Sequence, residues 1–305
     1  MKTKIFILIV SYNGTKWLSK CLKSCVPFNV IVVDNNSSDG TVSFIKKNFP
    51  KITILQQNKN LGFGAANNIG ISHALKNGAE YVFLLNQDAY LEPNTVERLI
   101  KCHEENTDFG ILSPIHLNGN ATKLDYNFSK YIAVNKKLQY DALKQLFSQQ
   151  IYEVPFVNAA AWLLPRKTLE KIGGFDPIFY HYSEDVNYCQ RVLFHKLKIG
   201  IVPEVYALHD RELRSKMIIK NKTEKLEHLE RSLKQKWSDI NIEAENDIIK
   251  KKQSLLKQTL KLFIKLMIND TIFNINKYML LNNILPEIRK SRKKNKEVGL
   301  HYLDD

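Results

Sequence analysis

The sequence lacks any long apolar run. Nothing in its 305 residues approaches the roughly 18 uninterrupted apolar residues that a membrane-spanning helix requires, so no transmembrane helix is expected. The N-terminal stretch MKTKIFILIVSYNG has a basic start and a short apolar run, as a signal peptide would. No small-residue cleavage site follows, however, and Ser11 to Gly14 are typical of a turn that ends a strand. We therefore predict that this run is the first strand of the fold.

Cysteine is scarce as well. The four cysteines, Cys21, Cys25, Cys102 and Cys189, show no metal-binding spacing. Cys21 and Cys25 lie four apart on an expected helix and are more typical of packing residues than of a redox pair. A reducing, cytoplasmic compartment is expected. The length suffices for one large domain with an appendage, or for two domains.

Positive charge is abundant and unevenly spread along the chain. The net charge is +14, from 45 basic and 31 acidic side chains. Residues 1–210 hold 23 basic and 18 acidic side chains, whereas residues 211–305 hold 22 and 13. Most of the excess therefore lies in less than a third of the chain. This asymmetry indicates anionic lipid or another polyanion as a partner and carries no information about the fold.

Strand and helix patterns alternate along the first 114 residues. This alternation predicts βαβ units and an α/β fold with a mostly parallel sheet flanked by helices. Right-handed crossovers would place the carboxyl ends of the parallel strands at one edge of the sheet. The expected strands are 5–10, 30–33, 52–55, 81–85 and 110–114, and the expected helices are 15–24, 41–48, 64–77 and 93–105.

The pattern changes after residue 114. Residues 115–151 predict irregular structure or small antiparallel strands, and 154–164 predict a strand through the core. A helix is expected from Ser183, as its N-cap, to residue 194, followed by a strand at 198–202 that Pro203 closes. Residues 211–305 have helical periodicity and form a separate basic region, in which 250–268 is an amphipathic helix with a lysine-rich face.

The apolar run Tyr81–Leu85 leads directly into Asn86, Gln87 and Asp88. A carboxylate at the carboxyl end of a buried strand lies where open α/β sheets bind their ligands. Asp88 is therefore a candidate for the meeting point of a divalent cation and a phosphate. The alternative is a helix-capping aspartate in a loop between strand and helix.

Six motifs occur in order within residues 1–210. They are VSYNG (10–14), VVDNNSSDGT (32–41), NKNLGFGAANNIG (58–70), LLNQD (84–88), GGFD (173–176) and the stretch 182–210 that begins YSEDVNYC. Together they resemble the family 2 glycosyltransferases, and most closely the rhamnosyltransferase-like branch of bacterial surface polysaccharide synthesis in the cell envelope. The resemblance implies a glycosyltransferase A (GT-A) fold with a nucleotide-sugar-binding half, residues 1–114, and an acceptor-binding half, residues 115–210.

The resemblance also implies a set of donor-binding residues. The carboxylates of Asp34 and Asp39 can accept hydrogen bonds from a base N–H and from ribose hydroxyls, although Asp39 could instead serve only a turn or a helix cap. Gly62, Gly64 and Asn67 would line the nucleotide pocket, with close helix packing as the alternative role of the glycines. A dinucleotide fingerprint is excluded because it should follow the first strand. The other implied donor-binding residues are Ser11, Tyr12, Asn13, Asn36, Asn60, Asn86 and Gln87.

Catalytic roles follow from the same resemblance. Asp88 would bind Mn²⁺ or Mg²⁺, although Asn86 stands where the family usually has an acid. His209 is either a further metal ligand or an ordinary histidine at a strand end. Asp185 would be the general base that deprotonates the acceptor, and Glu184 would orient it. The structural alternative for this pair is favourable interaction of two acids with a helix N-terminus.

The resemblance also suggests residues that bind the acceptor and residues that reach the diphosphate. Trp162 and Asp176 are implied to form the acceptor wall, because aromatic faces suit sugar rings, although a core position is as reasonable for Trp162. Arg211 and Arg214 could reach the diphosphate. The chain lacks the family's usual Gly-Ser continuation after His209, which argues against that role.

The resemblance implies an inverting, metal-assisted glycosyltransferase, a hexosyltransferase such as a rhamnosyltransferase. Its donor would be a UDP- or dTDP-sugar and its acceptor a saccharide or lipid-linked sugar, with no nucleic-acid partner. One alternative is a catalytically inactive nucleotide-fold protein that binds membrane or polyanions through its basic tail. Another is a nucleotidyltransferase, but the Gly-rich, Arg/Lys-containing loop expected after the first strand is absent.

Two interpretations of the basic tail remain open. Residues 250–268 and 289–296 could bind an anionic bilayer, where each basic residue contributes about 1 kcal/mol, and the protein would then lie peripherally on the inner face of the plasma membrane. Alternatively, the tail is a helical appendage that packs on the catalytic domain or on a second subunit of a homo-oligomer.

Overall fold

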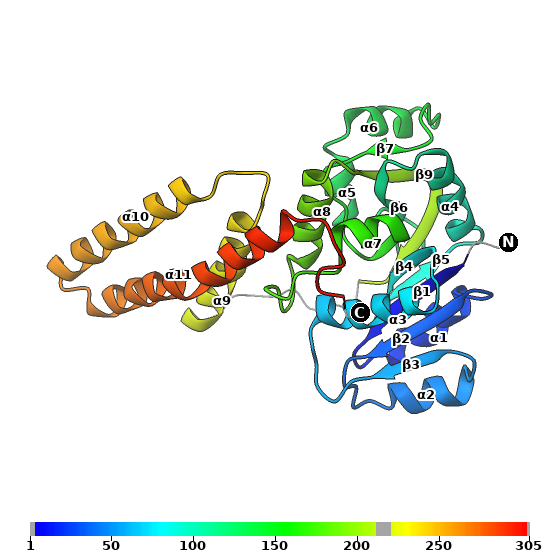
Figure 1. Ribbon diagram of the computed structural model, residues 1–305, viewed down its shortest axis with the longest axis horizontal. Helices are drawn as coiled ribbons and strands as arrows, with labels where there is room; N and C mark the ends of the chain where they lie inside the picture. The colour runs from blue at the N-terminus through cyan, green and yellow to red at the C-terminus, as the bar shows by residue number, and fades with distance from the viewer. Residues whose placement is uncertain (1–3, 212–220, 304–305) are drawn as a thin grey trace.

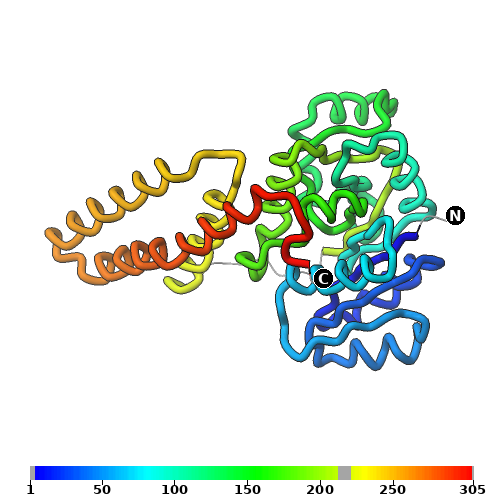
Figure 2. The backbone as a smooth tube through the Cα atoms, in the orientation of Figure 1, coloured from blue at the N-terminus to red at the C-terminus, as the bar shows by residue number. Residues whose placement is uncertain are grey.

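The computed structural model describes residues 4–211 and 221–303 (Figure 1). An α/β domain carries a helical C-terminal region that projects from one side of it (Figures 1 and 2). Within the described residues the central sheet has nine strands, and eight of them follow the order β3-β2-β1-β4-β8-β6-β9-β5, with β7 pairing with β9. The expected α/β fold with a helical C-terminal region is confirmed.

The first half of the sheet is parallel, because each strand is followed by a crossover helix. β1 pairs in parallel with both β2 and β4, and β2 pairs with β3. The elements are β1 (Ile5–Ser11), α1 (Thr15–Ser24), β2 (Asn29–Asp34), α2 (Thr41–Asn48), β3 (Thr53–Gln56), α3 (Phe63–Lys76) and β4 (Tyr81–Asn86).

The second half of the sheet is mixed. β8 is antiparallel to β4 and β6, whereas β6 and β9 are parallel, and both β5 and β7 are antiparallel to β9. The elements are β5 (Ala89–Leu91), α4 (Thr95–Glu105), β6 (Phe109–Asn118), α5 (Phe128–Ile132), α6 (Lys136–Leu143), β7 (Tyr152–Glu153), β8 (Ala161–Pro165), α7 (Arg166–Ile172), α8 (Glu184–Phe194) and β9 (Lys198–His209).

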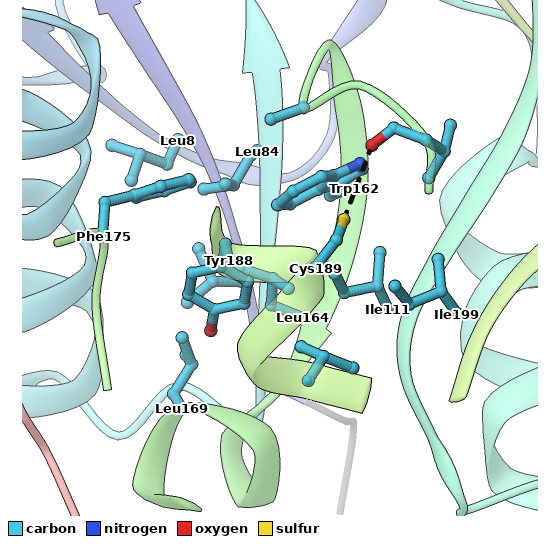
Figure 3. Close-up of a cluster of buried hydrophobic side chains, with 14 of the residues drawn as sticks. Leu8, Leu84, Ile111, Trp162, Leu164, Leu169, Phe175, Tyr188, Cys189 and Ile199 are labelled. Carbon is cyan, nitrogen blue, oxygen red and sulfur yellow. Dashed lines mark hydrogen bonds between the residues drawn. The ribbon is translucent and has the colours of Figure 1, made fainter. Parts of the chain in front are cut away.

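Two apolar cores cover the two faces of the sheet. Leu8 and Leu84 belong to one core and Ile7 and Phe83 to the other, because successive side chains of a strand point to opposite faces. Figure 3 shows part of the first core, with Leu8 and Leu84 beside aromatic side chains. On this face a Cβ at Gly70 would collide with Leu8, so glycine lets α3 approach β1 closely.

Two expectations for residues 115–164 are wrong. Residues 115–118 belong to β6 and the following segment holds the short helices α5 and α6, although β7 does provide a small antiparallel pair. The expected strand over 154–164 begins only at Ala161. Pro155 has no backbone N–H to donate, and the Ala160 amide donates to the Asn158 carbonyl in a tight turn. The segment before β8 is therefore a loop.

Pro203 does not end the last strand. β9 continues to His209, and the pairing with β6 shifts at this point, since Pro114 faces Val202 while Ile115 faces Tyr206. Residues 203–205 are thus an insertion in β9, where Glu204 has a φ of 57°. A proline is tolerated in a strand at such a bulge, because no ladder amide is required there.

Within residues 221–303, three helices form the C-terminal region. They are α9 (Lys222–Trp237), α10 (Glu245–Ile264) and α11 (Ile268–Asn295). α10 and α11 form an antiparallel hairpin that points away from the sheet (Figures 1 and 2). Near its base the hairpin packs with α9 in a third core that contains Trp237, Leu255 and Leu285. Within the described residues, no helix has the length and apolar character that crossing a bilayer demands.

The end of the chain returns to the α/β domain. The Gly174 amide donates to the His301 carbonyl over 2.7 Å, and the Gly299 amide donates to the Lys171 carbonyl over 3.1 Å. Leu303 is buried in the core between the sheet and α7 and α8. The boundary near Arg211 stays a prediction, and the structure adds that the last residues pack on the part of the chain before it.

We predict that Leu303→Ala lowers the free energy of unfolding by about 2 kcal/mol, because it removes a buried side chain from a packed core. Leu300→Ala is the matched control, since Leu300 is 42% exposed, and it should cost less than about 0.5 kcal/mol. Urea unfolding of the full chain measures both. Equal shifts in the two variants would show that the chain end does not dock on the domain.

Candidate functional site

A pocket of about 790 Å³ opens at the carboxyl edge of the parallel strands. Its size is in the range of small-molecule sites. Polar residues that follow β1 and β4 form one part of its wall, and the start of α8 forms another. It is lined by Val10, Tyr12, Asn13, Trp17, Asn35, Asn60, Gly62, Phe63, Asn86, Gln87, Asp88, Asn127, Tyr131, Phe156, Asn158, Ala159, Ala160, Tyr180, His181, Tyr182, Glu184, Asp185, Val186 and Arg211.

Two asparagines organise the part of the wall that follows β2 and β3. The Asn35 side chain donates to Asn60 Oδ1 over 2.8 Å and accepts from the Leu61 amide over 2.8 Å. Asn60 Oδ1 also accepts from the Gly62 amide. A Cβ at Gly62 would collide with the Tyr180 carbonyl, and its φ of 82° also favours glycine. The loop 60–62 is thereby fixed against β2.

Gln87 links the ends of β1 and β4. Its Oε1 accepts from Ser11 Oγ over 2.9 Å and from the Tyr12 amide over 3.0 Å, while its Nε2 donates to the Tyr12 carbonyl. Asn13 plays a similar role towards the turn after β2, since its Oδ1 accepts from the Ser38 amide over 2.9 Å. Ser11 is fully buried and does not line the pocket. Ser11 therefore supports the pocket wall and is not part of it.

The predicted carboxylates after β2 do not face the pocket. Asp34 is fully buried and its Oδ2 accepts from the Ser37 amide, so the expected contact with the donor is not available in this structure. Both oxygens of Asp39 accept from Thr15 and Thr41, at the first residues of α1 and α2, which is its structural alternative. The exposed Asn36 has a φ of 68° and lies outside the pocket, where its neighbour Asn35 is found instead.

Gly64 and Asn67 also lie outside the pocket. A Cβ at Gly64 would lie 3.0 Å from Phe175 Cβ and 3.6 Å from Glu184 Cβ, so this glycine allows α3 to pack closely against the start of α8. The buried Asn67 donates to the Phe63 carbonyl one turn earlier in its own helix. For these two positions the structure favours helix packing over direct contact with a nucleotide.

Asp88 lines the pocket, and its neighbour His209 is not among the lining residues. His209 Nε2 lies 3.5 Å from Asp88 Oδ1, and both side chains are almost fully buried. A second carboxylate, Asp125, lies with its Oδ2 3.8 Å from His209 Nδ1 and 3.5 Å from Arg211 Nε. Burial lowers the pKa of His209, and Asp88 opposes that shift. The neutral imidazole expected near pH 7 has one ring nitrogen that can accept, and Arg211 Nε lies 3.1 Å from both ring nitrogens.

The side chains present suit a divalent cation only in combination with a phosphate. Within residues 4–211 and 221–303, no three His, Cys, Asp or Glu side chains are arranged to hold a metal ion by themselves. Carboxylate and imidazole are two ligand types that Mn²⁺ accepts. His209 Nε2 and Asp88 Oδ1 are 3.5 Å apart, whereas adjacent ligand atoms of an octahedral ion are about 3 Å apart, so the two distances are similar. Diphosphate oxygens and water would have to complete the coordination.

The acidic pair lies at the start of α8, after two residues with positive φ. Tyr182 has a φ of 67° and Ser183 a φ of 74°, an uncommon conformation for non-glycine residues. Glu184 and Asp185 follow as the first two residues of α8 and both line the pocket. Asp185 Oδ1 accepts from the Val186 amide over 2.8 Å. Such backbone strain is typical of functional sites held in place by their surroundings.

Burial shifts both acids of the pair in the same direction. It raises the pKa of Glu184 to about 8, with a further contribution from the neighbouring Asp185. It also raises the pKa of Asp185, but backbone amides of Val186 and Ala159 stabilise the carboxylate and oppose the shift. Among the described residues, Glu184 Oε2 is buried with no hydrogen-bond partner. Glu184 is therefore expected to be protonated at pH 7, while Asp185 is the more accessible acceptor of a proton.

The C-terminal region holds the start of α8. Ser183 Oγ donates to Gln235 Oε1 over 2.7 Å and Asn187 Nδ2 donates to Ser238 Oγ over 3.2 Å. The expectation that Ser183 caps α8 with its side chain is therefore wrong, since its hydroxyl is used by α9 and makes no cap hydrogen bond. This supports the interpretation of the tail as a helical appendage packed on the catalytic domain.

The expected acceptor wall of Trp162 and Asp176 is wrong. Trp162 is fully buried, and its ring stacks on Phe175 with centroids 6.2 Å apart (Figure 3). Asp176 is also buried, and its Oδ2 accepts from Ser291 and Asn295 of α11. Trp162 points into the core because β8 is an interior strand, and Asp176 connects the chain's last long helix to the α/β domain.

Three tyrosines, and not Trp162, present exposed aromatic side chains in the pocket. Tyr180 and Tyr182 line the pocket and are substantially exposed, as is Tyr12 on the opposite strand end. The sequence signal for these tyrosines is the aromatic run 179–182, which ends two residues before Glu184 and which the motif includes only in part. The sequence did not indicate that Asp125 lies near His209, because Asp125 belongs to a segment without a clear helix or strand pattern. Arg211 lines the pocket, whereas Arg214 lies outside the described residues.

Comparisons with known proteins bear on the family and the fold of the chain. Residues 6–173 match the family described as "Glycosyl transferase family 2". The chain is 23% identical over 216 residues to the dTDP-rhamnosyl transferase RfbF of Shigella flexneri, covering 68% of this chain and 70% of that protein. It is 22% identical over 221 residues to the rhamnosyltransferase WbbL of Escherichia coli K12, covering 67% and 83%.

A solved structure shares the fold. The crystal structure of S. aureus TarS 1-349 in complex with UDP-GlcNAc aligns with a TM-score of 0.56 and 16% identity, covering 96% of this chain and 88% of that one. The likeness extends over the C-terminal helices as well as the sheet, since almost the whole chain is aligned. The expected GT-A fold is thus confirmed.

We predict that the unfolding free energy falls as the pH rises from about 4.5 to 8, and that Glu184→Gln flattens this dependence. The pKa of Glu184 is raised from 4.5 to about 8, so the folded state keeps a proton that the unfolded chain releases, and each pH unit in this window favours unfolding. Urea unfolding at several pH values measures the slope. Glu170→Gln, an exposed glutamate on α7, is the control; a slope that both variants leave unchanged would contradict the assignment.

Proposed function

The chain belongs to glycosyl transferase family 2 and is a glycosyltransferase, and from this premise we propose that it transfers a hexose with inversion from a nucleotide-diphosphate donor to a saccharide or lipid-linked acceptor. The observation that carries the proposal is that Asp88 and Asp185, 97 positions apart in the sequence, line one pocket. A group that can bind the diphosphate side and a group that can accept a proton thus face the same space.

The proposed donor is a pyrimidine nucleotide sugar, and dTDP-rhamnose is the first candidate. Support comes from the similar proteins RfbF, described as a dTDP-rhamnosyl transferase, and WbbL, described as a rhamnosyltransferase. A UDP-sugar is the second candidate, because the TarS structure contains UDP-GlcNAc. Asn60, which lines the pocket beside the ends of β2 and β3, would contact the nucleoside, and the buried Asn35 would hold it in position. Surface polysaccharide synthesis is the corresponding proposed process.

Asp88 and His209 would hold a divalent cation, Mn²⁺ or Mg²⁺, with the donor. Such an ion offsets the negative charge that develops on the leaving diphosphate. The buried position of both side chains strengthens their interaction with a cation, because little water competes there. Arg211, whose Nε is 3.1 Å from both ring nitrogens of His209, adds a positive charge on the same side of the pocket.

Asp185 would act as the general base. In an inverting transfer the acceptor hydroxyl attacks the anomeric carbon, its proton passes to Asp185, and the bond from that carbon to the diphosphate oxygen breaks. A carboxylate near the sugar also stabilises the positive charge of the transition state. Neutral Glu184, beside it, can donate a hydrogen bond to the acceptor and so orient it without adding a second negative charge.

The acceptor would lie against the exposed aromatic side chains of the pocket mouth. Tyr180 and Tyr182 lie within four residues before the acidic pair and offer faces that suit sugar rings. A lipid-linked acceptor would require the protein to work peripherally on the inner face of the plasma membrane. The alternative of an inactive nucleotide-fold protein is less well supported, because Asp88, Glu184 and Asp185 are all present in one pocket.

We predict that Asp185→Asn lowers the turnover number at least about a thousandfold, because the amide cannot accept the acceptor proton. Donor affinity should change less than about twofold, since the side chain stays the same size. Calorimetric titration with dTDP-rhamnose and UDP-GlcNAc, followed by transfer assays with the donor that binds, measures both. Asp108→Asn, on the surface in an ion pair with Lys198, should behave as the unaltered protein. Unchanged turnover of Asp185→Asn would contradict the role of base.

A separate prediction concerns the cation. Mn²⁺ should raise donor affinity in the unaltered protein, and Asp88→Asn should remove most of that increase, because a neutral amide binds a hard cation weakly. Thermal-shift titrations of the nucleotide with Mn²⁺ and with EDTA measure the effect without an activity assay. Asp108→Asn again serves as the control. If Asp88→Asn keeps the full Mn²⁺ effect, the cation is bound elsewhere.

A further inference from the structure

In the outer part of the α10–α11 hairpin the buried side chains are polar, whereas many of the apolar side chains are exposed. All of residues 256–280 are described, and the two buried ones among them are Thr271 and Asn274. Asn274 Nδ2 donates across the hairpin to the Leu255 carbonyl and to Thr259 Oγ1, each over 3.1 Å. The helices are therefore joined here by hydrogen bonds, and the apolar core ends near Leu255, closer to the base.

The apolar side chains of this outer part face away from the hairpin seam. Many of them belong to residues 260–272, on either side of the turn between α10 and α11. In Figures 1 and 2 this turn is the end of the hairpin farthest from the sheet. The exposed fractions reach 66% for Phe263, 71% for Ile264 and 80% for Leu266. Contiguous exposed apolar side chains of this number mark a surface that is covered by a partner. We call the group Leu260, Phe263, Ile264, Leu266, Ile268 and Ile272 the hairpin tip.

Basic side chains accompany the hairpin tip. Residues 249–279 contain seven lysines and one acidic residue, Asp270. Lys257, Lys261 and Lys265 recur every four residues along α10 and are all exposed. Lysine stems can lie along an apolar surface while the ammonium groups reach towards phosphate. The surface thus combines an apolar end with positively charged lysine side chains beside it.

We propose that the hairpin tip inserts into the interface of an anionic lipid bilayer, with the lysines on the lipid headgroups. A bilayer satisfies both features at once, since apolar side chains enter the acyl boundary and each nearby lysine gains from the negative surface. A second copy of the chain would satisfy the apolar side chains but would bring the two sets of lysines together. At 1.5 Å per residue, the 20-residue α10 extends about 30 Å, which holds the tip well away from the sheet.

This inference specifies the surface behind the peripheral location in the proposed function, but it does not depend on the chemistry. Vesicle binding needs neither donor nor acceptor, and transfer to a water-soluble acceptor needs no vesicles. Failure of one measurement therefore leaves the other intact. The C-terminal segment is kept in every variant, because α11 and the chain end bind Asp176 and Gly174.

The test is co-sedimentation of the full chain with vesicles of phosphatidylcholine alone or with 30% phosphatidylglycerol. The unaltered protein should sediment with the anionic vesicles. The triple variant Phe263→Gln, Ile264→Gln, Leu266→Gln should bind at least tenfold more weakly. The triple variant Lys257→Gln, Lys261→Gln, Lys265→Gln should lose about tenfold to a hundredfold in affinity, and only on anionic vesicles.

Matched controls use exposed residues of the α/β domain. Leu143→Gln with Leu146→Gln controls for lost surface apolarity, and Lys46→Gln, Lys47→Gln, Lys51→Gln controls for lost charge. Both should sediment as the unaltered protein does. Because every substituted side chain is exposed, circular dichroism and the urea midpoint should stay unchanged in all variants.

A second readout locates the contact. Tryptophan fluorescence of Phe263→Trp should be quenched by brominated phosphatidylcholine in the anionic vesicles, whereas that of Leu143→Trp should not. Three outcomes would overturn the proposal: equal binding of the tip variant and the unaltered protein, absence of quenching at position 263, or a dimer in solution that the tip variant dissociates while vesicle binding is absent. The last outcome would assign the tip to a second copy.

Discussion

The parallel register of β1 with its two neighbours is the constraint on which the pocket depends. Ser11 lies opposite Asp34, and Val10 opposite Asn86, so β1, β2 and β4 end at nearly the same level. The polar residues that follow each strand then face one space. A slip of one residue would move Leu8 from one core to the other face, because the side-chain period of a strand is two. The apolar alternation that builds both cores therefore also positions the site.

The C-terminal helices support the segment that carries the acidic pair of α8. A buried carboxylate is costly unless it is hydrogen-bonded, and Asp176 accepts from Ser291 over 2.6 Å, from Asn295 over 2.7 Å and from Tyr302 over 3.2 Å. Asp176 begins the loop that leads to the acidic pair of α8, and Gln235 holds Ser183 at its end. The loop is thus fixed from the C-terminal region at both ends, which explains how two strained φ angles are maintained next to Glu184.

Local periodicity was sufficient to predict the elements of the first 105 residues, except the three-residue strand β5, and the edge of the sheet at which the pocket opens. The strands and helices there agree to within about two residues, because their apolar faces repeat regularly and polar turns separate them. The sequence did not reveal which residue of a turn faces the pocket. Asn35 and not Asn36 faces the pocket, since a left-handed residue directs the chain outward at Asn36.

Long-range contacts account for the remaining errors. The residue type of Trp162 suggests a sugar-binding surface, but only the pairing of β8 between β4 and β6 decides that its ring is enclosed. Pro203 suggests the end of a strand, and only the shift in pairing with β6 shows why the strand continues. Asp125 reaches His209 through the path of a segment that has no sequence signal. In each case the deciding interaction joins residues far apart in the chain.

The two amides before Asp88 have a physical role in this arrangement. Gln87 both accepts from Ser11 and donates to the Tyr12 carbonyl, and a carboxylate at this position could not donate, so that carbonyl would lose its partner. Asn86 Nδ2 lies 3.4 Å from His209 Nε2 without adding charge. With Asp88 and Asp125 already buried around one histidine, a further carboxylate would raise the electrostatic cost of leaving the site without a cation. The amides at 86 and 87 therefore fix the ends of the strands by hydrogen bonds without adding charge, whereas the carboxylate at residue 88 can bind positive charge.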